Sequence, residues 1–529
     1  MNWPLTISEE DFDIIYKGLN IDKSIFKREP ESDADYITNF LVSKLWRLNN
    51  LYTIIDKDGV KQIFNMNRSQ HVVYAALLRH PRLIILKSRQ QGISTFWLIS
   101  YFDDAKFYDN LSVGMMAQGL EEASTLLERV KLADENFPAG LQEFLGLSLV
   151  QDNTKAIGWN NGSTIFIRTS FRSATLQRLH VSEMGKIAAK APEKAKELKT
   201  GTLQTIKPGN PVVIESTAEG RNNAFHSMWY SAIDHIGQRG PKDFYPVFLS
   251  WLDDPDCTLN IPQRETTKSL SYFSKLEEDT GRVLTDEQRW FWIAQERELG
   301  DDVYQEYPGT PEEAFAAVRD GTYYAQIFRE QKDNIVENLY DENLDVSVAI
   351  DLGMNDTMVM LFFQQHRDEL RIIDEYHNSG EAILHYVQIL RGKNYTYADI
   401  YLPHDAKVKE LGTGKSRVDI FREHGVKARV MRRTRSVHND IELVRNTIPR
   451  IKVDASLDYI LDTFRNYTKQ WDDKLGVWKD KPLHNEWSNP ADAIRYAVIA
   501  SRKNVLLADE KKNKKRAAYY ERRNVGFDI

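Results

Sequence analysis

The chain has 529 residues, 42% of them hydrophobic, and a formal net charge of -7, which together exclude an intrinsically disordered protein and predict two or three folded domains. Its single cysteine, Cys257, excludes an internal disulfide framework and a zinc site built from several cysteines. No apolar run approaches the roughly 20 residues needed to cross a bilayer, and residues 1–16 lack the basic segment and apolar core of a secretory signal, so we expect no membrane association.

The first half of the sequence alternates short β-rich runs with longer amphipathic stretches. We predict strands at 82–86, 111–117, 163–168, 178–182 and 211–217. Strands that alternate with helices are typical of a mostly parallel sheet, and ligands of such sheets bind beyond the carboxyl ends of the strands. We therefore expect functional side chains among the polar residues that follow these strands.

The stretch "LKSRQQGIST" follows the first predicted strand and has the outline of a phosphate-binding loop whose lysine is displaced. In the pattern G-x-x-x-x-G-K-[ST], lysine follows the second glycine. Here Gly92 and Ser94 keep their spacing, isoleucine stands in the usual lysine position, and Lys87 stands in the first-glycine position. Because backbone N–H groups at a helix N-terminus bind phosphate, the loop predicts a nucleotide site in which Lys87 or Arg89 supplies the cation and Ser94 contacts Mg²⁺. A plain strand, turn and helix with solvent-exposed Lys and Arg side chains is the alternative.

A candidate catalytic carboxylate follows a later strand. In "RLHVSEMG" the strand ends directly before Glu183, where an ATPase needs a carboxylate to orient the attacking water. The preceding position, usually Asp, is Ser182, so we expect weaker or water-mediated metal contact there. A strand that ends in Glu before a loop is common, and a purely structural role stays open.

Two further segments extend the predicted nucleotide site. The segment "VVIESTAEG" ends a strand in Ser216, Thr217 and Ala218, small and hydroxyl residues that can sense a nearby phosphate. An ordinary polar turn has the same pattern. Upstream, Gln70 can present its amide to the hydrogen-bonding edge of adenine. The alternative interpretation is an exposed glutamine on a helix.

The second half of the chain contains a different unit. Residues 280–315 are helical and charged, and residues 319–345 contain no strong strand, so we expect the domain junction there. A β-rich unit then opens with runs at 346–365 and 370–378, continues at 399–406 and closes on a helix at 489–502. The predicted organisation is a lead-in (1–60), a first α/β domain (61–320), a linker (321–345), a second, mixed α/β domain (346–503) and a charged tail (504–529).

Three aspartates predict a metal site in the second domain. Asp351 and Asp405 each end a strand-like run, and Asp492 lies at the start of the closing helix. Hard oxygen ligands suit Mg²⁺ or Mn²⁺, and a two-metal site can activate water and stabilise the leaving oxygen in phosphodiester cleavage. Taken singly, each aspartate is also typical of a helix cap or a turn.

Taken in order, these segments resemble the large terminase subunit of tailed bacteriophages, the motor that packages DNA into procapsids. The resemblance covers about residues 60–500 and is carried by Gln70, "KSRQQGIST", "RLHVSEMG", "VVIESTAEG", "YQEYPGTPEEAF", "VAIDLGMNDT", "YLPHDA" and "WSNPADAIRYAV". It implies an α/β fold class, with an N-terminal P-loop ATPase domain around a mostly parallel sheet and a C-terminal RNase H-like mixed α/β nuclease domain.

The resemblance also implies roles for residues of the first domain. Terminases are similar in using a variant loop with the basic residue at its entrance, so Lys87 would replace the missing lysine and Arg89 would also contact phosphate. Glu183 would be the catalytic carboxylate, and Ser216, Thr217 and Ala218 would couple hydrolysis to movement. The residues expected at ATP or its Mg²⁺ are Gln70, Lys87, Ser88, Arg89, Gln90, Gln91, Gly92, Ile93, Ser94 and Thr95.

For the second domain and the assembly, the resemblance implies that Asp351, Asp405 and Asp492 bind the Mg²⁺ or Mn²⁺ of the nuclease. It implies double-stranded DNA, a portal protein and a small terminase subunit as partners. The expected assembly is a pentameric ring at the portal vertex of a procapsid in the host cytoplasm. The arginine that a neighbouring subunit would insert is not assigned, and Arg129, Arg168, Arg172 and Arg221 are the candidates.

Two other classes of protein share part of the pattern. A helicase or repair-type DNA-dependent ATPase would share the first domain without needing the second acidic cluster. An RNase H-like recombination nuclease would share the second domain without needing the ATP loop. Because the net charge is negative, DNA contact would depend on local basic patches such as 427–435 and 511–523. The second patch, in the tail, could also dock on the portal, and a solvated tail is the alternative.

Overall fold

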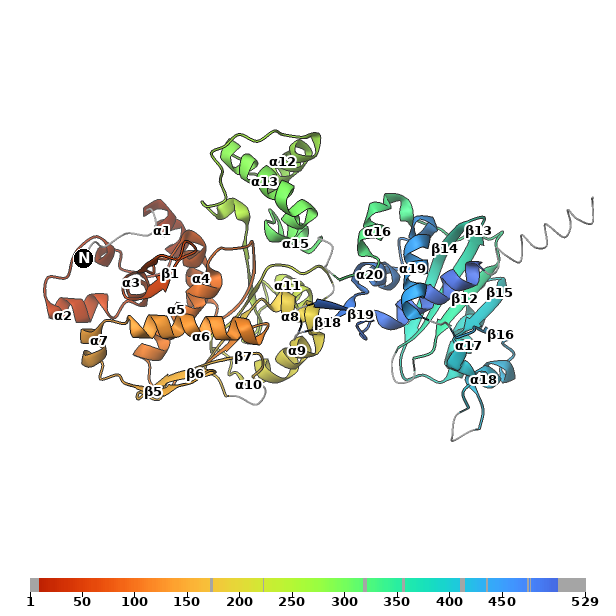
Figure 1. Ribbon diagram of the computed structural model, residues 1–529, viewed down its shortest axis with the longest axis horizontal. Coiled ribbons are helices and arrows are strands. Elements are labelled where there is room, and N and C mark those ends of the chain that lie inside the picture. Colours follow the sequence, from red (N-terminus) through yellow and green to blue (C-terminus); the bar gives the residue numbers. More distant parts are fainter. Residues whose placement is uncertain are drawn as a thin grey trace, which may run out of the picture. The chain divides into compact units, whose positions relative to one another are not determined.

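The computed structural model describes residues 9–171, 175–221, 223–316, 321–353, 357–409, 414–433, 436–472, 475 and 477–502. The chain forms two compact units, Met1–Ala317 and Val318–Ile529, and each is built on its own sheet (Figure 1). Among the described residues, no helix combines the length and the apolar character that a membrane span requires. The predicted charged tail, including the basic patch at 511–523, lies outside the described residues.

An eight-stranded sheet forms the centre of the first unit. Across the sheet the order is β10 (Tyr245–Leu249), β3 (Arg82–Lys87), β9 (Val212–Ser216), β8 (Arg178–Ser182), β4 (Ser112–Met116), β7 (Thr164–Arg168), β6 (Ala156–Trp159) and β5 (Leu149–Asp152). The strands from β10 to β7 run parallel, and β6 and β5 continue the sheet antiparallel beyond β7. The predicted mostly parallel α/β fold is therefore confirmed for this unit.

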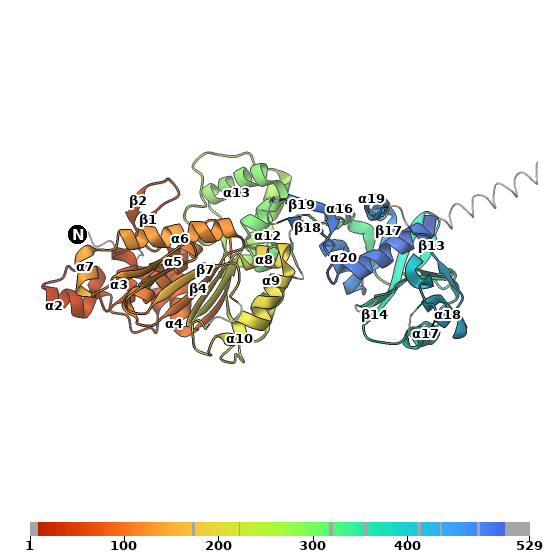
Figure 2. The same ribbon diagram turned by 60° about the horizontal axis from the view of Figure 1, so that its bottom comes forward.

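Both faces of this sheet are covered, which explains why its strands are continuous apolar runs. Side chains alternate along β3, so Leu83 and Ile85 pack in one core while Ile84 and Leu86 pack in the other. The first core includes side chains of α3 (Lys44–Asn50), α4 (Arg68–Arg79), α5 (Ile93–Phe107) and α6 (Leu120–Glu135). The second includes side chains of α8 (Met184–Lys190), α9 (Pro192–Glu197), α11 (Ala224–Asp234) and α15 (Pro311–Ala316). Figure 2 shows α5 and α6 along one face of the sheet.

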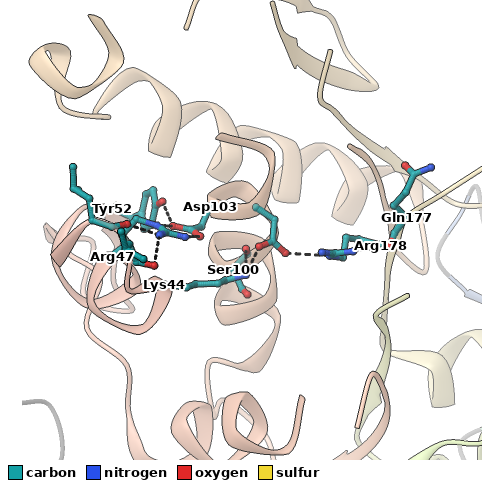
Figure 3. Close-up of polar contacts among 10 residues, drawn as sticks. Lys44, Arg47, Tyr52, Ser100, Asp103, Gln177 and Arg178 are labelled. Atoms are coloured by element: carbon teal, nitrogen blue, oxygen red, sulfur yellow. Dashed lines mark hydrogen bonds and ion pairs between the residues drawn. The ribbon is translucent and has the colours of Figure 1, made fainter. Parts of the chain in front are cut away.

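Helix α5, which follows the predicted phosphate loop, is held by two buried carboxylates near its C-terminal end. Asp103 accepts from Arg47 Nε at 2.8 Å and Nη2 at 2.7 Å, and also from the hydroxyl of Tyr52 (Figure 3). Asp104 pairs with Lys44 on one side, at 2.6 Å, and with Arg178 of β8 on the other, at 3.2 Å. These pairs fix α5 between α3 and the sheet, which makes it a rigid support for the loop at its N-terminus.

The remaining elements of the first unit surround this core. The other described α-helices and strands are α1 (Glu9–Tyr16), α2 (Asp33–Asp35), β1 (Thr53–Ile55), β2 (Lys61–Ile63), α7 (Ala139–Phe144), α10 (Leu203–Thr205), α12 (Thr267–Thr280), α13 (Asp286–Leu299) and α14 (Val303–Glu306). Side chains of α12, α13 and α14 contribute to a separate apolar cluster around Trp251 and Trp292.

A seven-stranded mixed sheet forms the centre of the second unit. The order is β11 (Ile335–Val336), β17 (Ile451–Asp454), β14 (Glu369–Asn378), β13 (Met358–His366), β12 (Val346–Asp351), β15 (Tyr397–Leu402) and β16 (Ala428–Val430). Strands β12, β13 and β14 form an antiparallel meander, and β15 lies parallel to β12 on its other side. The predicted mixed α/β fold is confirmed here too, and part of residues 321–345 belongs to this unit through the pairing of β11 with β17.

Helices cover both faces of the second sheet. One core includes side chains of α16 (Ala325–Glu330), α19 (Val437–Thr447), α20 (Asp458–Asn466) and the closing helix over residues 488–502. The other includes side chains of α17 (Ile383–Gly392) and α18 (Arg417–Glu423). A separate hairpin consists of β18 (Lys469–Asp472) and β19 (Val477–Pro482).

Candidate nucleotide site and acidic sheet edge

The loop between β3 and α5 has the backbone shape of an anion site. Gln90 and Gly92 have positive φ angles of 63° and 68°, and residue 91 between them does not, an alternation that turns successive N–H groups towards one side. The positive φ favours glycine, and a Cβ at this position would lie 2.7 Å from Gln70 Nε2 and displace that amide. Gly92 precedes Ile93, the first residue of α5. The loop therefore presents backbone donors at the N-terminus of a long helix.

Gln70 holds this loop from α4. Its amide Nε2 donates to the carbonyl of Gly92 at 2.9 Å, and its Oε1 accepts from the backbone N–H of Asn67 at 2.9 Å. Asn67 caps α4 and also donates to the carbonyl of Gln91 at 3.1 Å. Both ends of the Gln70 amide have partners in the protein, and its contact with adenine stays a prediction.

The opposite side of the loop is fixed to β10. The N–H of Ser88 donates to the carbonyl of Leu249 at 2.9 Å, and Gln91 donates to the carbonyl of Ser250 at 3.1 Å. Arg89 turns towards Glu306: its N–H donates to the Glu306 carbonyl at 2.8 Å, and its guanidinium lies 3.4 Å from the Glu306 carboxylate. Arg89 is thus placed apart from the cluster around Lys87, and its contact with phosphate stays a prediction.

Lys87 lies between two carboxylates at the carboxyl end of the sheet. Its Nζ is 3.2 Å from Glu183 Oε1 and 3.3 Å from Glu215 Oε2, and its side chain is only 7% exposed. Burial would lower the pKa of Lys87, but the charges of Glu183 and Glu215 raise it above its usual value. The displaced lysine therefore stays a cation where the parallel strands end.

Glu215 was not singled out by the sequence patterns, and it is the centre of a polar cluster. It accepts from Ser94 at 2.6 Å and from Ser182 at 2.9 Å, and His180 Nε2 lies 3.4 Å away. Burial would raise the pKa of Glu215, but Lys87 and His180 hold it below its usual value. A signal was available in the sequence, since a charged residue inside the apolar run "VVIES" is rarely buried without partners.

Glu183 has a strained backbone and faces a pocket. It precedes α8 with φ of 56°, a left-handed conformation that few residues other than glycine adopt and that is typical of functional sites. A pocket of about 420 Å³ is bordered by Glu183, Ser94, Ser182 and Arg129, together with side chains of α6. Arg129 also donates to the hydroxyl of Thr95 at 3.5 Å. The pocket therefore brings the candidate catalytic carboxylate, the loop serine and an arginine together within one chain.

The other arginine candidates have different surroundings. Arg168 lies over the ring of Phe166, with 4.8 Å between the guanidinium carbon and the ring centroid. Arg221 is exposed, and Arg172 lies outside the described residues.

The predicted coupling segment contacts the start of α8. Ser216 Oγ accepts from the N–H of Gly185 at 2.9 Å, and a Cβ on Gly185 would lie 2.7 Å from the carbonyl of Thr217. Thr217 and Ala218 are buried. The end of β9 is thus in direct contact with the turn that carries Glu183.

In the second unit, two of the three predicted aspartates share one edge of the sheet. Asp351 ends β12, and Asp405 lies in the 3-10 turn His404–Lys407 just after β15. Because β12 and β15 are parallel and Ala349 pairs with Tyr401, the two strands end side by side. Residues 354–356, which follow this edge, lie outside the described residues.

Asp492 comes to this region from the closing helix. Burial raises the pKa of Asp351 well above its usual value, and the charges of Asp492 and Asp405 add to the effect. Asp492 is paired with Arg495 at 2.9 Å. The three aspartates therefore interact electrostatically, although no three metal-binding side chains among the described residues gather closely enough to hold an ion as they stand.

The sequence patterns did not identify two residues that lie near Asp492. Asp440 of α19 is buried, and its Oδ2 has no hydrogen-bond partner among the described residues. Burial raises the pKa of Asp492, and the charge of Asp440 adds to that effect. His484 opposes that effect and, with Asp492 and Lys481, borders a pocket of about 580 Å³. Nothing in the local sequence marks Asp440, since only folding brings α19 to the closing helix.

No family model and no curated protein matches the sequence. Among solved structures, the chain is similar to the large terminase of bacteriophage HK97, with 12% identity, 87% of this chain and 99% of that chain covered, and a TM-score of 0.41. It is also similar to the large terminase of a thermophilic bacteriophage in complex with ADP, with 13% identity, 80% and 94% covered, and a TM-score of 0.30. A third similar structure is the large terminase nuclease domain of bacteriophage SPP1 with bound Mn, with 17% identity, 32% and 96% covered, and a TM-score of 0.26.

Proposed function

We propose that the chain is a large terminase subunit, in which ATP hydrolysis by the first unit drives double-stranded DNA into a procapsid and the second unit cuts that DNA. The proposal rests above all on the cluster of Lys87, Glu183 and Ser94 beside the phosphate-type loop. It is further supported by the acidic sheet edge in the same chain and by the ordered motifs that resemble terminases.

In the first unit, the loop N–H groups and Lys87 would bind the phosphates of ATP. When nucleotide binds, Lys87 can exchange its contacts with Glu183 for the phosphates, which frees Glu183 in the pocket. Glu183 would then orient the attacking water and accept its proton. Ser94 fits as the Mg²⁺ ligand because its hydroxyl already donates to a carboxylate, and bound Mg²⁺ would neutralise charge that develops on the phosphates.

In the second unit, Asp351, Asp405 and Asp492 would hold Mg²⁺ or Mn²⁺, which would activate water for phosphodiester cleavage. Three carboxylates are the oxygen ligands that such a cation takes, and a bound cation would offset the burial and repulsion that raise the pKa of Asp351, although the side chains would have to draw closer to hold it. The pocket beside Asp492 is bordered by Lys481, His438 and His484, which are suitable contacts for a phosphate backbone. DNA, a portal protein and a small terminase subunit would be the partners, and a pentameric ring at the portal vertex in the host cytoplasm would be the working assembly.

The test separates the two activities in one purified chain. Glu183→Gln should abolish phosphate release from ATP and spare plasmid cleavage with Mn²⁺, whereas Asp405→Asn should do the reverse. Phosphate release by the parent should rise when procapsids that carry portal and linear DNA are added. A parent that hydrolyses ATP with DNA but never cleaves it would indicate a helicase or repair-type ATPase, and one that cleaves DNA without hydrolysing ATP would indicate a recombination nuclease.

A further inference from the structure

The first unit lacks a carboxylate at a position where P-loop NTPases use one to hold Mg²⁺. P-loop NTPases hold Mg²⁺ with a loop Ser or Thr and with a carboxylate at the end of a neighbouring strand. In this chain that strand, β8, ends in Ser182, which has no charge to offer. If the first unit hydrolyses ATP, as proposed above, another side chain has to supply the negative charge.

Glu215 lies where such a charge is needed. In the sheet, β8 and β9 are parallel neighbours and Ser182 pairs with Glu215, so the carboxylate is one strand away from the usual position. One oxygen, Oε1, accepts from both Ser94 and Ser182, whose own hydroxyl oxygens are 3.3 Å apart. Glu215 itself is fully buried behind these serines, whereas Ser94 and Ser182 both border the pocket.

This geometry lets both hydroxyl groups donate to Glu215. When both protons point at Glu215, the lone pairs of Ser94 and Ser182 are left for a cation on the pocket side. A hydroxyl that donates to a carboxylate is also a better ligand, because the partner makes its oxygen more electron-rich. The second oxygen, Oε2, has Lys87 at 3.3 Å and no hydrogen-bond partner among the described residues.

We infer that Glu215 is the positioning residue for the Mg²⁺ of bound nucleotide: through Ser94 and Ser182 it replaces the carboxylate that the end of β8 lacks. Glu183 keeps a different role, because it borders the pocket directly, which Glu215 does not. This role of Glu215 depends on the proposed ATP site. It predicts that a carboxylate at the end of β8 can replace the one on β9 and still support Mg²⁺ binding.

The experiment measures the affinity of a fluorescent ADP analogue with Mg²⁺ and with EDTA. In the parent, Mg²⁺ should tighten binding. In Glu215→Gln this Mg²⁺ effect should fall at least about tenfold, as is typical when a partner of a metal ligand is removed, while binding in EDTA persists. The double variant Ser182→Asp with Glu215→Gln should recover the Mg²⁺ effect, and Glu121→Gln, which changes another carboxylate at the same pocket, should retain it as the matched control.

Thermal melts of each variant are the control for folding. If Glu215→Gln does not fold, Glu215→Asp keeps the negative charge but withdraws the carboxylate from Ser94 and Ser182, and it should show the same loss. An unchanged Mg²⁺ effect in a folded Glu215 variant, or no recovery in the double variant, would overturn the inference alone. A parent that does not bind the analogue at all would overturn the proposed ATP site, and the inference with it.

Discussion

Replacing Lys87 by alanine tests whether the displaced lysine serves both folding and hydrolysis. The side chain is 7% exposed and lies within 3.3 Å of Glu183 and Glu215, the latter fully buried. Removing one partner of a buried ion pair costs about 3–5 kcal/mol, because the other charge is left unpaired. For a unit of this size, that loss lowers the melting temperature by on the order of 10 °C. Loss of the cation at the phosphates should slow ATP turnover by about 100-fold or more.

The stability loss should depend on pH in a defined direction. In the parent, the pKa of Glu215 is held below its usual value, so its contribution is present above the unfolded pKa of about 4.3 and is lost as pH falls. Without Lys87, burial raises the pKa of Glu215 instead, and the folded variant gains stability by taking up a proton. The difference in stability between parent and Lys87→Ala should therefore narrow as pH falls from 7 towards 4.

The measurements are phosphate release and thermal melts from pH 4 to pH 8. Lys186→Ala is the matched control, since Lys186 Nζ also lies 3.5 Å from Glu183, but its side chain is 30% exposed. A partly exposed pair of this kind contributes about 0–1 kcal/mol, so this variant should melt close to the parent. Parent-like turnover in Lys87→Ala, or a stability difference that does not change with pH, would refute the reasoning.

Three further changes probe other parts of the structure. Burial and the charge of Asp492 raise the pKa of Asp351, so the melting temperature of the metal-free parent should fall as pH rises from about 4 through that raised pKa. In EDTA, the melting temperature of Asp351→Asn should not show this fall, and with Mn²⁺ the variant should not cleave plasmid DNA. Arg129→Ala, which removes the arginine from the Glu183 pocket, should lower phosphate release by about 10- to 100-fold with little change in ADP-analogue affinity; parent-like release would exclude a role in cis. Arg47→Ala leaves Asp103 buried without its guanidinium partner and should cost about 3–5 kcal/mol in urea unfolding; a loss below 1 kcal/mol would contradict that role.

The strands that position the nucleotide site could be predicted because burial on both faces makes them uninterrupted apolar runs. β3, β8 and β9 are all found within a residue or two of their expected bounds. β10 was missed, since its short run contains Pro246 and the pattern does not favour a strand. Its position beside β3 nevertheless matters, because it holds Ser88 and Gln91 of the loop.

Local sequence patterns predicted the individual site residues. Their contact partners could not be predicted, because these contacts depend on the register of neighbouring strands. A local pattern identifies Ser182 as an unusual residue at a strand end, yet only the pairing of β8 with β9 places Glu215 beside it. The same holds for Asp440, which reaches the acidic edge from another helix. Side chains that meet across neighbouring strands or helices have no characteristic spacing in the sequence, so no local motif identifies them.

The end of β9 offers a physical basis for the coupling expected of Ser216, Thr217 and Ala218. Successive side chains of a strand point to opposite faces of the sheet. Glu215 accordingly contacts Ser94 at the start of α5, while Ser216 accepts from Gly185 in the first turn of α8. Two helices on opposite faces are thus joined through one peptide unit. Gly185 has no room for even a Cβ against Thr217, so α8 cannot settle closer to β9 when the contacts of Ser94 change. A change at the phosphate loop would therefore reach the Glu183 turn through β9, which is what coupling by Ser216, Thr217 and Ala218 would require.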